Sequence, residues 1–179
     1  MTQDQSVLPS HLSIRLGIMG FSQAANQIRI AQADGMVVGL CHGCFDILHF
    51  GHLRHLESAA RSCDLLIVSI TADRYVNKGP KRPIFAEKYR AELLSGLACV
   101  NGVVISDFPT ALEVLRDLRP SIFFKGQEYH IDGPVANPNF QIEREFASSI
   151  GTEVMHTHEE TFSSTETLSR LYETLREQL

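Results

Sequence analysis

The sequence predicts an α/β fold in which five parallel strands form a doubly wound sheet with helices on both faces. Short apolar runs, mostly rich in β-branched or large side chains, alternate with segments whose apolar residues have helical spacing, and this alternation occurs five times. Parallel strands need crossover helices, and in such sheets ligands bind at the carboxyl ends of the strands. Functional residues are therefore expected just after each strand.

The first predicted element is a helix within residues 12–33, closed by Asp34 and Gly35. The strands are expected at the apolar runs 36–41, 65–70, 102–105, 122–124 and 154–155. Further helices are expected after Gly51, over 86–99, 111–118 and 140–150, and from Ser163, where a capping box begins. This order divides the chain into an N-terminal extension with a helix, residues 1–35, and one domain, residues 36–179.

The composition is that of a globular protein. Of 179 residues 44% are hydrophobic, with 12 glycines and 7 prolines, which excludes collagen-like and disordered chains. The four cysteines fall in predicted strands or helix ends, as reduced core thiols do. No apolar run approaches the length of about 18 residues that spans a bilayer. The first ten residues lack a signal-peptide pattern, so we expect a cytoplasmic protein.

The charge is distributed unevenly along the chain. A net charge of −5 argues against sustained binding to nucleic acid or to an anionic membrane. Between Arg74 and Arg90, however, six basic residues stand against the single acid Glu87. Because this segment follows a predicted strand, it is a candidate binding site for a small anion.

The first strand leads into the sequence His-Gly-Cys-Phe-Asp-Ile-Leu-His-Phe-Gly-His, residues 42–52. Gly43 would let a phosphate approach the backbone closely, and a helix that starts at Gly51 would direct unpaired N–H groups to the same place. His49 and His52 flank that start, where two imidazoles can stabilise charge on a phosphoryl group. The sequence therefore predicts an anion-binding turn.

This turn resembles the His-x-Gly-His signature of the nucleotidyltransferase superfamily. Residues 43–49 resemble the Gly-x-Phe-Asp-x-x-His form of cytidylyltransferases and of the adenylyltransferase domain of ADP-heptose synthase. The resemblance, which implies a Rossmann-like fold, extends to four later segments: the Lys78-Gly79 loop with Arg82-Pro83, Tyr89-Arg90, the Lys-Gly-x-Asp-Tyr-like residues 125–129, and Ser163-Ser164-Thr165.

The last of these segments departs from the cytidylyltransferase pattern. Cytidylyltransferases have Arg-Thr-x-Gly before the serine, whereas this chain has His158, Glu159, Glu160 and Thr161 there. The heptose-phosphate adenylyltransferases also lack that arginine, although the glycine is missing from both comparisons. This departure and the Lys125-Gly126 match favour the adenylyltransferase branch, with CTP left as the other donor.

The resemblance implies that an acceptor phosphate oxygen attacks the α-phosphorus of ATP or CTP and releases pyrophosphate. His49 and His52 would contact the α-phosphate, and Lys78 both the α-phosphate and the acceptor phosphate. Mg²⁺ would arrive with the triphosphate. The acceptor would be a sugar phosphate or a polyol phosphate, and the family suggests a homodimer.

Other residues take supporting roles in this comparison. Asp46 would organise the loop, while Asp73 would contact the acceptor or simply be solvated. Nucleotide binding is implied for Gly43, Cys44, Phe45, Gly51, Arg90, Lys125, Gly126, Ser163, Ser164 and Thr165.

Two alternatives compete with this interpretation. One is a nucleotide-binding protein that keeps the fold without catalysis. The other is a zinc-binding module, because Cys41, Cys44, His49 and His52 are four possible zinc ligands. For His55, one turn beyond His52, we expect no more than a solvent-facing position.

Overall fold

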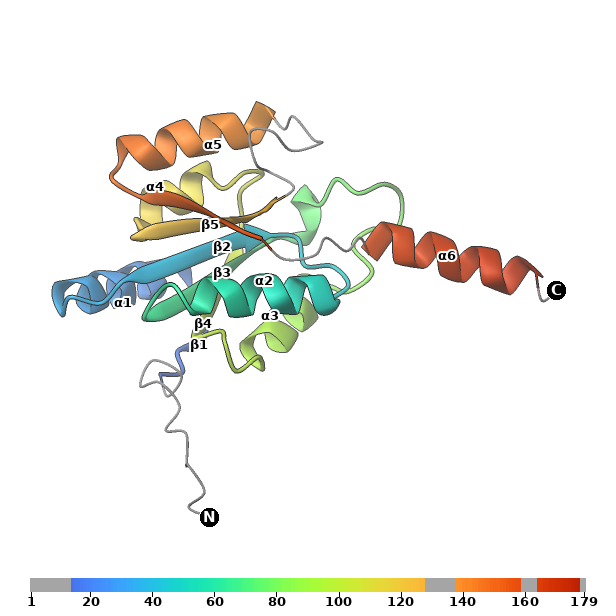
Figure 1. Cartoon of the computed structure of the whole chain (residues 1–179), viewed down its shortest axis with the longest axis horizontal. Coiled ribbons are helices and arrows are strands. Elements are labelled where there is room, and N and C mark those ends of the chain that lie inside the picture. The colour runs from blue at the N-terminus through green and yellow to red at the C-terminus, as the bar shows by residue number, and fades with distance from the viewer. Residues whose placement is uncertain (1–13, 128–137, 159–163, 178–179) are drawn as a thin grey trace, which may run out of the picture.

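The computed structural model describes residues 14–127, 138–158 and 164–177. Its centre is a parallel sheet of six strands in the order β1-β4-β3-β2-β5-β6 (Figure 1). The strands are β1 (Gly17–Met19), β2 (Val38–Gly43), β3 (Leu65–Thr71), β4 (Gly102–Ser106), β5 (Ile122–Gly126) and β6 (Glu153–Thr157). The predicted doubly wound α/β class is confirmed.

Helices cover both faces of this sheet. One face packs against α1 (Phe21–Ala33), α4 (Leu112–Leu118) and α5 (Pro138–Ser149), and the other against α2 (Phe50–Ala60) and α3 (Glu87–Ser95). Every residue of β3 is buried, as expected of a parallel strand covered on both sides. In β2 the side chains alternate, so that Leu40 joins one apolar cluster and Cys41 the other.

The sixth strand, β1, is a correction to the five that the sequence predicts. It occupies the start of the stretch predicted as a helix, and it pairs with β4 through Gly17 and Gly102. Just before it, the Leu16 N–H donates to the Asn101 carbonyl at 2.7 Å, and Arg15 donates to the Leu97 carbonyl at 2.7 Å. Three residues are too few to show an alternating pattern. Residues 17–33 of the predicted extension thus lie in the layers of the sheet.

The strand order predicts a ligand crevice at the carboxyl ends of β2 and β5. From β2 the chain passes to β3 and β4 on one side, and then crosses to β5 on the other side. In such sheets the carboxyl ends of the strands flanking the reversal, here β2 and β5, diverge and open a ligand site. After β3, a short 3₁₀ helix, η2 (Asp73–Tyr75), begins the basic segment.

The last helix, α6 (Ser164–Glu177), extends away from the sheet in Figure 1. All the side chains described in it are exposed, Leu171 and Tyr172 included. Among the helices that the structure describes, none is long and apolar enough to cross a membrane.

Candidate active site

The turn after β2 is built on a left-handed residue. Phe45 has φ +48°, an uncommon conformation for a residue with a side chain. Its ring is only 6% exposed and lies 5.1 Å from the His52 ring, centroid to centroid. A Cβ on Gly43 would come within 3.2 Å of the Phe45 ring. Glycine at 43 therefore leaves the space in which this ring packs beneath the turn.

His49 and His52 cap the start of α2 reciprocally. The helix begins at Phe50, one residue before the predicted start, and His49 is its N-cap. The N–H of His52 donates to Nδ1 of His49, and the N–H of His49 donates to Nδ1 of His52, each at 3.4 Å. The two rings stack with 3.8 Å between their centroids. Because Nδ1 accepts in both residues, the proton of each neutral ring is on Nε2, which can donate.

Both imidazoles are held in the neutral form. Burial, together with its neighbours His49, Lys78 and His55, lowers the pKa of His52 to about 3. Burial, followed by the charge of Lys78, also lowers the pKa of His49. At pH 7 the two rings therefore offer Nε2–H donors without charge. The positive charge that acts on both rings is on the exposed side chain of Lys78.

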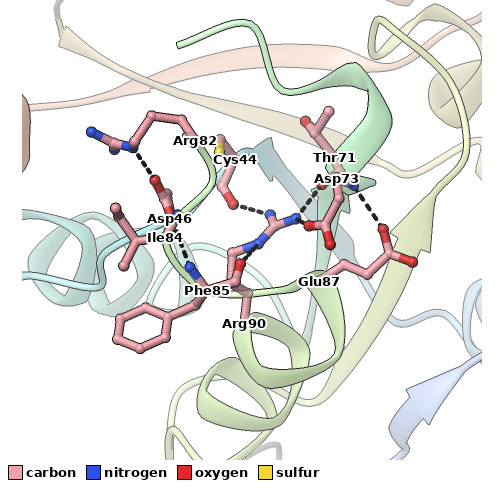
Figure 2. Close-up of polar contacts among 9 residues, drawn as sticks. All are labelled: Cys44, Asp46, Thr71, Asp73, Arg82, Ile84, Phe85, Glu87 and Arg90. Carbon is pink, nitrogen blue, oxygen red and sulfur yellow. Dashed lines mark hydrogen bonds and ion pairs between the residues drawn. The ribbon is translucent and has the colours of Figure 1, made fainter. Parts of the chain in front are cut away.

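Asp46 connects this turn to the segment before α3 (Figure 2). The residue is 1% exposed. Its Oδ1 accepts from the N–H groups of Ile84 at 2.6 Å and Phe85 at 3.2 Å, and its Oδ2 accepts from Nε of Arg82. Burial alone would raise the pKa of Asp46, but the bonds from Phe85, Arg82 and Ile84 outweigh it and lower the pKa. The carboxylate is thus ionised and fully engaged by protein donors.

Arg90 holds three segments together from beneath. It is 1% exposed, and its Nε donates to the Phe85 carbonyl at 2.9 Å. Nη1 donates to the Cys44 carbonyl, while Nη2 donates to the Thr71 carbonyl at 2.8 Å and to Oδ1 of Asp73 at 2.7 Å (Figure 2). The sequence predicts Arg90 as a triphosphate ligand. The structure instead engages all three of its nitrogens with protein oxygens, because Arg90 lies on the buried face of α3.

Asp73 is likewise engaged by the protein. Besides its ion pair with Arg90, its N–H donates to Oε2 of Glu87 in the first turn of α3 at 2.7 Å. The side chain of Asp73 remains 40% exposed at the carboxyl end of β3. The sequence allows two roles for Asp73, a contact with the acceptor or a solvated surface residue. The structure adds a third role, a link between η2 and α3.

Lys125 points toward α5, where it pairs with an acid of the protein. Its Nζ is 2.8 Å from Oε2 of Glu143 in α5, and both side chains are less than a tenth exposed. Phe123 and Phe140 lie beside the ammonium, with their ring centroids 4.8 and 5.3 Å away. The sequence predicts nucleotide binding for Lys125, whereas the structure gives it a buried ion pair. Gly126 ends β5 at the crevice itself.

Residues 40–170 match the model of the family described as cytidylyltransferase-like. The chain belongs to the cytidylyltransferase-like family. The predicted enzyme class, a nucleotidyltransferase, is thereby confirmed.

Among curated relatives, bifunctional protein HldE of Hyphomonas neptunium is 41% identical over 117 residues, which cover 64% of this chain and 24% of the relative. The HldE protein of Geobacter sulfurreducens is 38% identical over 113 residues, or 62% and 23% of the two chains. This cytidylyltransferase-like chain therefore spans about a quarter of the length of the curated relatives it matches.

Two solved structures share the fold. A lipopolysaccharide core biosynthesis protein from Thermoplasma volcanium has a TM-score of 0.58 at 24% identity, with 72% of this chain and all of that chain covered. Pantoate-beta-alanine ligase from Francisella tularensis has a TM-score of 0.57 at 16% identity, with 89% and 79% covered. At these identities the likeness concerns the fold alone.

The remaining predicted residues of this cytidylyltransferase-like site are those of the Ser-Ser-Thr segment and the cysteines. Ser163 lies outside the described residues, and Ser164 and Thr165 begin α6 without described side chains. Cys44 is half-buried on the turn, and burial raises the pKa of its thiol. Cys41, which the zinc alternative requires, is fully buried within the apolar cluster under α2. Within the described ranges no three candidate ligands gather as a metal site would require.

The structure gives contacts to three residues near the site for which the sequence predicts no definite role. Nδ1 of His55 lies 2.7 Å from Oγ1 of Thr157, so His55 joins α2 to β6, contrary to the expected solvent-facing position. Burial, with help from the charge of Lys125, lowers the pKa of His42 to about 3, and its Nδ1 lies 3.1 Å from Oγ of Ser69. Arg82 is the third, and its only signal in the sequence is the Arg-Pro pair after Lys78.

Proposed function

We propose that this chain transfers a nucleotidyl group from ATP to the phosphate of a phosphorylated sugar and releases pyrophosphate, as a heptose-phosphate adenylyltransferase does. Identities of about 40% to HldE proteins and the missing arginine before residue 163 favour this branch of the family. The fold is also shared with a lipopolysaccharide core biosynthesis protein. Transfer from CTP, and a polyol phosphate as acceptor, are the variants of the same reaction to be tested beside it.

The observation that carries the proposal is the pair of neutral histidines at the start of α2. In the reaction an acceptor phosphate oxygen forms a bond to the α-phosphorus, and the bond from that phosphorus to the bridging oxygen of pyrophosphate breaks. The Nε2–H groups of His49 and His52 would donate to the α-phosphate oxygens as charge shifts across them. The N-terminus of α2 favours an anion at the same position.

Lys78 would supply the positive charge between the two substrates. It lies on the exposed loop after η2, and it is close enough to act on the pKa values of both histidines. No general base is required, because a phosphate acceptor is already ionised at neutral pH. Mg²⁺ would enter with the triphosphate as part of the substrate, held by the phosphate oxygens.

The proposal is tested by a matrix of donors and acceptors. ATP and CTP, each with Mg²⁺, are combined with a heptose 1-phosphate, other sugar 1-phosphates and glycerol 3-phosphate, and pyrophosphate release is measured. We expect release with ATP and a sugar 1-phosphate. Binding of ATP without pyrophosphate release for any acceptor would favour the non-catalytic alternative.

A further inference from the structure

The side chain of Arg82 is buried but incompletely satisfied. It is 9% exposed, and its Nε donates to Oδ2 of Asp46. Its Nη2 is fully buried and, among the described residues, has no hydrogen-bond partner. Buried guanidinium nitrogens are almost always paired, since an unpaired charged donor is costly. The unpaired N–H is therefore a candidate donor to a ligand oxygen.

The surroundings of Arg82 identify the chemistry of that oxygen. Arg82 lies four residues after Lys78 in the same loop, and its partner Asp46 lies on the histidine turn. Burial raises the pKa of the Cys44 thiol on that turn, and the thiol also experiences the nearby charges of Lys78, Arg90, Asp46 and Arg82. Asp46 balances the charge of Arg82 and Asp73 that of Arg90, so the charge of Lys78 is in excess and favours an anion over a neutral oxygen.

The engaged atoms leave Arg82 a defined geometry. Asp46 accepts from Nε, and its other oxygen is occupied by the N–H groups of Ile84 and Phe85. The ion pair with Asp46 thereby fixes the plane of the guanidinium, and with it the position of Nη2. A fixed planar guanidinium with an unengaged donor suits a phosphoryl group, because the oxygens of that group accept charge-assisted hydrogen bonds. Arg90, by contrast, has no nitrogen left over.

We propose that Arg82 is a substrate-binding residue whose Nη2 donates a hydrogen bond to a phosphoryl oxygen, and that Asp46 is the positioning residue that orients it. This inference rests on the proposed function, which supplies two sources of phosphoryl oxygen, the triphosphate and the acceptor. Loss of one charge-assisted hydrogen bond corresponds to about a 10- to 100-fold weaker interaction. The effect should therefore appear in the KM of whichever substrate makes the contact.

The experiment compares Arg82→Gln and Arg82→Lys with Arg116→Gln. Arg116 provides the matched control, because it pairs with Asp117 on the exposed surface of α4. Initial rates of pyrophosphate release give KM for each substrate with the other saturating. A rise of about 10- to 100-fold in the KM of the triphosphate assigns the contact to the donor, and the same rise for the sugar phosphate assigns it to the acceptor. Arg82→Lys, which keeps the charge beside Asp46, should recover part of the loss.

Thermal unfolding separates binding from folding. MgATP, MgCTP and a sugar phosphate, each added alone, should raise the Tm of the wild-type protein and of Arg116→Gln, and one of them should fail to raise the Tm of the Arg82 variants. The inference is overturned if the variants have a lower Tm without ligand, but keep both the ligand-induced shift and the KM values. If the wild type releases no pyrophosphate, the proposed function fails, while these ligand-induced shifts still decide the role of Arg82.

Discussion

Two buried ion pairs lie on either side of the crevice, and they differ in what they leave open. Lys125 and Glu143 close on each other: one Glu143 oxygen faces the ammonium, and the other accepts the N–H of Ala111 at 3.1 Å. Asp46 and Arg82 are buried just as well, but the buried Nη2 of Arg82 has no hydrogen-bond partner among the described residues. In the first pair both carboxylate oxygens of Glu143 are engaged within the core. In the second pair Nη2 of Arg82 can still donate.

The difference follows from where each basic residue lies relative to its strand. Lys125 is still within β5, so the pleat directs it to the same side as Phe123, toward α5. Arg82 lies in the loop beyond β3, where no pleat fixes its direction and the carboxylate of Asp46 does. The strand therefore sets the direction of Lys125, whereas the ion pair with Asp46 sets that of Arg82.

The largest expected effect concerns the closed pair. Lys125→Met leaves Glu143 buried without its counter-ion, which should lower the free energy of unfolding by about 3–5 kcal/mol. The double variant Lys125→Met/Glu143→Gln removes the buried charge, keeps an oxygen for the Ala111 N–H, and should recover more than half of that loss. Urea unfolding measures both. Unchanged stability together with a raised KM for ATP would instead mean that Lys125 contacts the nucleotide.

The next effect concerns the histidine pair across the crevice. His49→Ala and His52→Ala should each lower kcat by roughly 10²-fold or more, as expected when a donor to the transition state is lost. Arg116, on the exposed surface of α4, serves as the control, and Arg116→Gln should retain the wild-type kcat. Steady-state pyrophosphate release is the measurement. A kcat that is unchanged in both active-site variants would refute the mechanism.

A smaller effect appears in the dependence of stability on pH. The pKa of His42 is about 3 in the folded protein and about 6.5 when unfolded. Below pH 6.5 the unfolded chain therefore binds a proton that the native ring does not, so stability falls as the pH falls. Between pH 6.5 and 5 the loss from this one ring is about 2 kcal/mol. Urea unfolding at several pH values should show a shallower slope for His42→Asn than for the wild-type protein.

The smallest effect concerns an exposed pair in the same basic segment. Arg74 pairs with Asp107, and both side chains are more than half exposed. Arg74→Gln should change the free energy of unfolding by less than about 1 kcal/mol and leave both KM values unchanged. Unfolding and initial-rate measurements are compared with those of Arg82→Gln. Equal effects at Arg74 and Arg82 would show that net charge matters in this segment more than position.

The sequence predicts the sheet and the histidine turn well because both have local signals. Apolar runs reveal five of the strands, and the spacing of His49 and His52 reveals the turn. The faces of α3 have no such signal: Tyr89 and Leu93 are each 50% exposed, whereas Arg90 is 1% exposed. Hydropathy predicts the reverse exposure, with the arginine outside. Arg90 can be buried because the folded structure brings the carbonyl groups of Cys44 and Thr71 to its guanidinium, beside that of Phe85. The same holds for Lys125, whose acidic partner lies in the following helix.

The contacts of Arg90 and Asp46 also bear on how substrate preference could change during evolution. They hold the backbone at Thr71 on one side of the basic loop and at Ile84 and Phe85 on the other. The exposed residues 77–81 between these anchors bear little of the fold. Insertions, deletions or exchanges there would leave the histidine turn where it is. Apart from Lys78, which the proposed reaction uses, the sequence of this stretch is therefore free to change without disturbing the fold.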